Sequence, residues 1–148
     1  MKYFNEIYIG EEEHSDFAEK CYETILYMIN RLNEYYKMNP HAFKIIDKLC
    51  VELFFSETSE NVIDSDIVTV LQDIKIKVKE VIYSQRFYST FNNTIMKEAL
   101  SAGLIRYYLH KRGIKLSLKI FSNLFHISQS IVSKATSRIE SYIKIPNI

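Results

Sequence analysis

A face rich in hydrogen-bonding side chains lies near the C-terminal end of the sequence. Gln129, Ser130, Ser133 and Lys134 recur at spacings that place them on one side of a helix, and Arg138 continues that side one turn later. No acidic residue interrupts the face. Side chains of these types hydrogen-bond to the edges of bases and pair with phosphates. The pattern therefore predicts a surface that binds duplex DNA.

Two groups of contacts are expected on this surface. Base edges would be read by the hydrogen-bonding side chains near the start of the helix, which are Gln129, Ser130, Ser133 and Lys134. Phosphates would be bound by the surrounding cations, which are Lys115, Lys119, Lys134, Arg138 and Lys144.

The charge of the chain is divided unevenly between its two ends. Residues 1–63 carry six Lys or Arg against twelve Asp or Glu, whereas residues 64–148 carry thirteen against six, within a total net charge of +1. From Gly103 onward the chain holds eight cations and one acid, Glu140. A cationic end favours a polyanionic partner. A solvated helix face that keeps the protein soluble explains the same charges.

The elements that would position this surface are two short helices joined by a tight turn. Ser117 and Ser128 have the side chains that cap helix N-termini, and each precedes an amphipathic run. The apolar positions that would face inward are Ile120, Phe121, Leu124, Ile127, Val132, Ala135 and Ile139. Residues 117–143 are therefore predicted to form a helix-turn-helix.

The acidic half of the chain is predicted to be a helical hairpin over residues 16–56. Apolar residues recur every three or four positions over 16–37, and Pro40 follows a capping residue at the start of a second helix that runs to about residue 56. Residues 1–15 are expected to form an N-terminal tail.

The basic half, residues 64–148, is predicted to contain the remaining helices. An apolar stripe favours a helix over about 64–82, although the alternation in residues 74–78 also fits a strand. A further helix over about 94–112 has small residues at its middle, which is typical of a central helix. The expected fold is thus all-α, a single domain of about six helices over residues 16–148.

Several other functions are disfavoured by the sequence. Gly10, Gly103 and Gly113 are isolated from one another, so they form no glycine-rich phosphate loop. The longest apolar runs fall far short of the ~20 residues that cross a bilayer. Cys21 and Cys50 are expected to be buried free thiols. Glu6 and the acidic run Glu11-Glu12-Glu13 do not fit a signal peptide, so we expect a cytoplasmic protein. Because no catalytic or metal-binding set is recognisable, we expect that it is not an enzyme and holds no metal or cofactor.

The segment from Ala99 through Ile139 resembles the end of a cyclin-like repeat in transcription factor IIB and archaeal transcription factor B. The family's alanine-rich core corresponds to Ser101-Ala102-Gly103, its capping Thr or Ser to Ser117, and its turn to His126-Ile127-Ser128. These correspondences run without a gap over about a quarter of the chain.

The resemblance implies a cyclin-like five-helix unit with the helix at 16–37 as an addition. It also implies that the final helix reads DNA, since the family's base-contacting positions align with Ser130 and Ser133. The family has arginine where this chain has Ser133, and a turn glycine where it has His126. The family's zinc ribbon and second repeat have no counterpart here. These features fit a truncated or specialised relative from an archaeon or an archaeal virus, with the transcription machinery as a further partner.

A function of a different class stays open at this point. The acidic helices or a cyclin-like groove would serve a protein-protein adaptor that does not contact DNA. The apolar stripe of the helix at 16–37 would equally close a homodimer. No membrane partner is expected.

Overall fold

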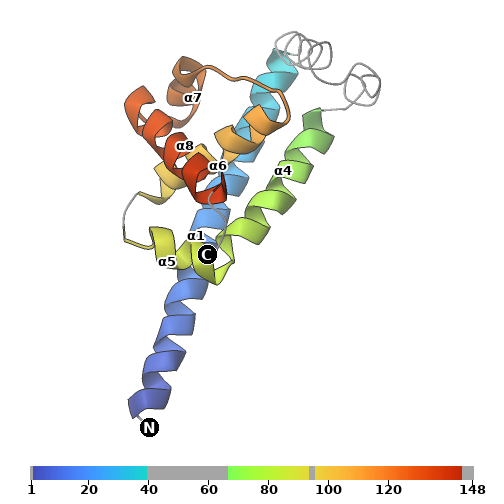
Figure 1. The fold of residues 1–148 in the computed structure, drawn as a ribbon. Helices are drawn as coiled ribbons and strands as arrows, with labels where there is room; N and C mark the ends of the chain where they lie inside the picture. The colour runs from blue at the N-terminus through green and yellow to red at the C-terminus, as the bar shows by residue number, and fades with distance from the viewer. Residues whose placement is uncertain (1, 40–66, 94–95, 145–148) are drawn as a thin grey trace.

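The computed structural model describes residues 2–39, 67–93 and 96–144, with side chains from Glu13 onward. Every regular element in these ranges is an α-helix, which confirms the all-α prediction. The six helices are α1 (Lys2–Met38), α4 (Ile67–Ile82), α5 (Gln85–Phe91), α6 (Lys97–Lys111), α7 (Leu118–Phe125) and α8 (Gln129–Lys144) (Figure 1).

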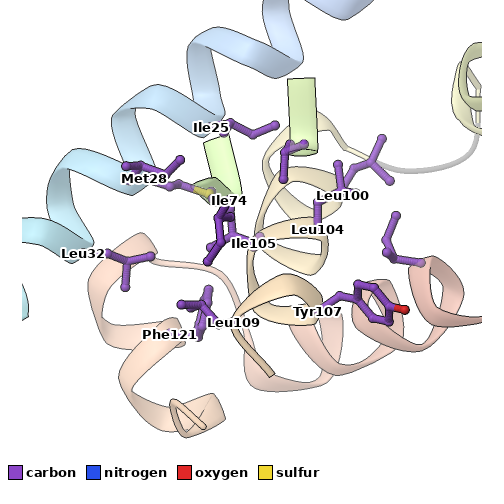
Figure 2. Packing of buried hydrophobic residues seen from close by; sticks show 14 of the residues in the cluster. Ile25, Met28, Leu32, Ile74, Leu100, Leu104, Ile105, Tyr107, Leu109 and Phe121 are labelled. Carbon is purple, nitrogen blue, oxygen red and sulfur yellow. The ribbon is translucent and has the colours of Figure 1, made fainter. Parts of the chain in front are cut away.

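Helix α6 is the centre of the packing. It contacts α8, α1 and α4, and every residue from Ala99 to Ile105 is buried. Figure 2 shows Ile25 and Met28 of α1 beside Ile74 of α4, with Leu100 and Leu104 of α6 across the same cluster. A helix that is apolar on all sides is typical of a core position, and the small residues at its middle were the sequence signal for this place.

Helices α6 and α8 cross in close contact at Gly103. A Cβ atom built on this glycine would lie 2.8 Å from the carbonyl carbon of Ala135 and 3.0 Å from its Cβ. Real Cβ atoms essentially never approach so closely, so the glycine is what allows this crossing. The position of α8 therefore depends on a residue of α6.

Helix α6 ends at a glycine with a left-handed backbone. Gly113 has φ 81°, and its N–H donates to the carbonyl of His110 at 2.9 Å. The N–H of Ile114 donates back to the carbonyl of Leu109 at 2.9 Å. This pair of hydrogen bonds is a Schellman motif, which satisfies the last carbonyls of the helix and turns the chain toward α7.

The apolar stripe of α1 is buried within the chain itself. Phe17, Cys21, Ile25, Met28 and Leu32 all lie in the core, against α4 and α6. The chain's own helices therefore cover the stripe that was considered as a homodimer surface, and a homodimer stays a prediction. Cys21 has a free thiol, and burial raises its pKa to about 12.

Two local predictions differ from the observed helices. The backbone is helical from Lys2, so residues 2–15 continue α1 where a tail was expected, and this end of α1 projects beyond the other helices (Figure 1). Once a helix is nucleated by packing, each added residue gains a hydrogen bond at little cost. Helix α5 was not predicted, and it lies between the helices predicted over about 64–82 and about 94–112.

The remaining helix predictions agree with the structure wherever it describes the chain. Helix α4 buries the predicted stripe, and residues 74–78 are helical rather than extended. Helix α6 begins about three residues later than predicted. The predicted helix over 40–56, the start of the helix predicted over about 64–82 and the second cysteine, Cys50, lie outside the described residues.

Candidate nucleic-acid interface

Both predicted N-terminal caps are formed. The Oγ atom of Ser117 accepts a hydrogen bond from the N–H of Ile120 at 3.2 Å, which starts α7. The Oγ atom of Ser128 accepts from the N–H of Ile131 at 3.3 Å, which starts α8. Each serine satisfies a backbone donor that the first turn of a helix leaves unpaired. The two helices therefore begin where the sequence predicted.

The turn between α7 and α8 depends on a left-handed residue. His126 has φ 57° and ψ 41°, and it is the one non-glycine residue with positive φ among those described. Its N–H donates to the carbonyl of Ser122 at 2.8 Å, and the next residue, Ile127, is buried. Histidine is among the residues that tolerate this conformation best. The turn is thus preserved without a glycine.

The inward face of the two helices is nearly the predicted one. The buried predicted positions are Phe121, Ile127, Val132, Ala135 and Ile139. Ile120 and Leu124 are only partly buried, whereas Phe125, which was not predicted, is buried. The inward face of α7 therefore includes Phe125, whose ring packs against that of Phe121, one turn earlier, with centroids 5.5 Å apart.

The outward face of α8 carries the predicted base-reading side chains. Gln129, Ser130 and Lys134 are exposed, Ser133 is partly exposed, and Arg138 continues the exposed face. The core contacts of α8 come from Val132 and other residues on its opposite side. The structure therefore brings the four predicted base-reading residues together on one solvent-facing surface.

The predicted phosphate-binding cations are all exposed, but they differ in their partners. Lys144 forms an ion pair with Glu140, with Nζ and Oε1 3.0 Å apart. An exposed pair of this kind contributes only about 0–1 kcal/mol, so Lys144 remains available to a stronger anion. Neither Lys134 nor Arg138 forms an ion pair with any residue that the structure describes. The remaining two, Lys115 and Lys119, lie before and within the first turn of α7.

One exposed residue on α8 was missed by the sequence reasoning. Ile131 follows Ser130 and is 39% exposed, although it is apolar. Apolar side chains in a major groove contact the methyl group of thymine. The only sequence signal for Ile131 was its place outside the inward positions that were assigned to the second helix.

His110 of α6 is influenced by charged residues of α6, of α8 and of the segment before α7. Burial lowers the pKa of His110 below its usual value, the charges of Arg106 and Lys115 lower it further, and Glu140 acts in the opposite direction. A histidine with a lowered pKa is neutral at neutral pH. His110 therefore adds no positive charge to the interface under these conditions.

Other kinds of site were searched in the described parts of the chain. No group of three or more His, Cys, Asp or Glu side chains there is arranged to hold a metal ion. None of the helices in these ranges is long and apolar enough to cross a membrane. No known family model, no curated protein and no solved structure matches the chain.

Proposed function

We propose that the protein is a DNA-binding transcription regulator that contacts duplex DNA through α7 and α8. The observation that carries this proposal is the one-sided burial of α8. Its apolar side packs on α6, and its polar, cationic side faces solvent beside a capped turn. A helix presented in this way fits the major groove, which is about 12 Å wide.

The proposed contacts follow from the position of each side chain. Gln129 at the start of α8 has an amide that pairs with adenine through two hydrogen bonds. Ser130 and Ser133 offer single hydrogen bonds. The base preference therefore differs from that of a helix with arginine in place of Ser133. Lys134 and Arg138 bind phosphates and give the affinity its dependence on salt.

The relation to transcription factor B belongs to the same proposal. In this proposal α4, α6, α7 and α8 are helices of a cyclin-like unit, and the predicted helix over 40–56 completes it. Helix α5 is an added short helix between α4 and α6. The protein comes from an archaeon or from an archaeal virus, and it acts in the cytoplasm. The transcription machinery is a further partner in this proposal.

The proposal is tested by duplex binding at several salt concentrations. The variant Lys134→Gln/Arg138→Gln loses two proposed phosphate contacts, which lowers the slope of log K against log salt by about 1.8. The matched control is Lys77→Gln/Lys111→Gln, which removes the same charge from exposed lysines of α4 and α6. Fluorescence anisotropy with a labelled duplex of random sequence measures both slopes, and the control is expected to keep the wild-type slope.

The competing function is the adaptor that does not contact DNA. It predicts that wild type and both variants bind the duplex equally weakly. Equal slopes for the α8 variant and the control would also contradict our proposal, because binding would then depend on net charge alone.

A further inference from the structure

A groove with an apolar lining lies between α4 and the C-terminal ends of α6 and α8. It has a volume of about 530 Å³. Its apolar lining residues are Ile74, Ile76, Tyr108 and Ile143, of which Ile76 is 57% exposed. An exposed isoleucine beside a groove gains free energy when a second surface covers it. These features suit a surface that contacts protein.

Cationic side chains line the same groove. Lys77 of α4 and Lys111 of α6 are exposed, and neither forms an ion pair with any residue that the structure describes. Arg112 also lines the groove, where it pairs with Asp73 at 3.2 Å. The two lysines thus place positive charge beside apolar surface. Charge placed in this way favours an acidic partner and disfavours a basic one.

The N-terminal end of α1 has the complementary composition. Residues 2–13 contain four acids, Glu6, Glu11, Glu12 and Glu13, against one lysine, Lys2, together with aromatic residues and isoleucines. Their backbone is helical, and Figure 1 shows this end of α1 projecting beyond the other helices. The chain therefore carries both an acidic, projecting helix end and a groove of opposite charge.

These two features of one chain are too far apart to meet. Figure 2 shows Ile74, which lines the groove, beside Met28 of α1. Glu13 precedes Met28 by fifteen residues of an unbroken helix, and at about 1.5 Å per residue ~22 Å separate the two levels. The acidic end of α1 consequently cannot fold back onto the groove of its own chain. An acidic end that fills the groove must belong to a second copy.

We propose that the groove binds the N-terminal end of α1 from a second copy of the chain. Glu11 and Glu12 of that end pair with Lys77 and Lys111, and its apolar residues cover Ile76. Two copies that exchange ends about a two-fold axis make both contacts at once, so the assembly closes as a dimer. This dimer uses neither the buried apolar stripe of α1 nor the proposed DNA contacts of α8.

The test measures self-association of the full-length protein in the absence of DNA. Lys77→Glu/Lys111→Glu reverses the charge of the groove, and Glu11→Lys/Glu12→Lys reverses the charge of the helix end. Sedimentation velocity over a range of protein concentrations gives the mass of each species. Far-UV circular dichroism establishes that each variant is folded.

The wild type is expected to shift from the mass of one chain toward that of two as its concentration rises. An interface made by one helix end is small, so the association is weak, and dilute protein such as that in duplex titrations remains a single chain. Each charge reversal is expected to weaken the association by about tenfold or more, because like charges then face each other. The matched control, Lys119→Glu/Lys134→Glu, reverses two exposed lysines that do not line the groove, and it is expected to associate as the wild type does.

The variant that carries both reversals gives the most specific readout. Its net charge equals that of the wild type, and its reversed helix end again meets a groove of opposite charge. It is therefore expected to recover the association that each reversal alone has lost.

Three results would overturn the proposal. The wild type could stay a single chain at every concentration, either reversal could leave the association unchanged, or the combined variant could fail to recover it. Association that persists in both separate reversals would place the contact between copies on another surface. No DNA enters these measurements, so their outcome is independent of whether the proposed function holds.

Discussion

Replacing Gly103 by alanine tests the close crossing on which the position of α8 depends. The new Cβ would lie 2.8 Å from the carbonyl carbon of Ala135, while carbon atoms in contact are normally about 3.5–4.0 Å apart. Helix α8 must then move outward by about 0.7 Å. Overpacking of this kind costs about 1–3 kcal/mol, and the better helix propensity of alanine offsets about 1 kcal/mol of it.

The net effect expected for Gly103→Ala is therefore a loss of up to about 2 kcal/mol in the free energy of unfolding. For a domain of this size that loss lowers Tm by up to about 6 °C. Thermal unfolding followed by circular dichroism measures the shift. A rise in Tm would refute the reasoning, because it would mean that only helix propensity had changed and that α6 and α8 leave room for a methyl group.

Three further predictions concern the turn and its surroundings. Ser128→Ala removes the cap of α8 and is expected to lower the free energy of unfolding, measured in urea, by about 1 kcal/mol. An unchanged urea midpoint would show that the cap contributes nothing. His126→Gly removes the side chain that disfavours the left-handed backbone, so the free energy of unfolding is expected to rise by up to about 1 kcal/mol. A destabilised variant would contradict this. The lowered pKa of His110 means that the unfolded chain takes up its proton first as the pH falls, so stability decreases below about pH 6.5, the unperturbed histidine value. In His110→Gln the difference between urea midpoints at pH 7.5 and pH 5 is expected to shrink, and an equal difference in both proteins would assign the effect to other groups.

Local signals made the helix-turn-helix predictable. Ser117 and Ser128 were expected to cap α7 and α8, and both accept the expected backbone hydrogen bonds. Caps and apolar spacing act within a few residues, so a single sequence contains them. The small residues of α6 were also informative, because only a glycine permits the contact that Gly103 makes with α8.

Signals that depend on distant packing were missed. Helix α5 has only two buried residues, Phe87 and Phe91, and two positions do not establish a helical period. The rings of Phe87 and Phe91 contact that of Tyr142, which lies far away in the sequence. The apolar stripe of α1 was recognised, but the sequence did not reveal that the chain's own helices cover it.

The central claim is that the outward face of α8 meets the duplex, and mapping of amide chemical shifts tests it most directly. The full-length protein is titrated at low salt with a duplex of random sequence. The account predicts that the largest shifts fall in residues 117–119 and 128–138, with little change at the exposed positions of α1 and α4. Shifts confined to α1 or α4, or no shifts at a salt concentration where nonspecific complexes form, would contradict it.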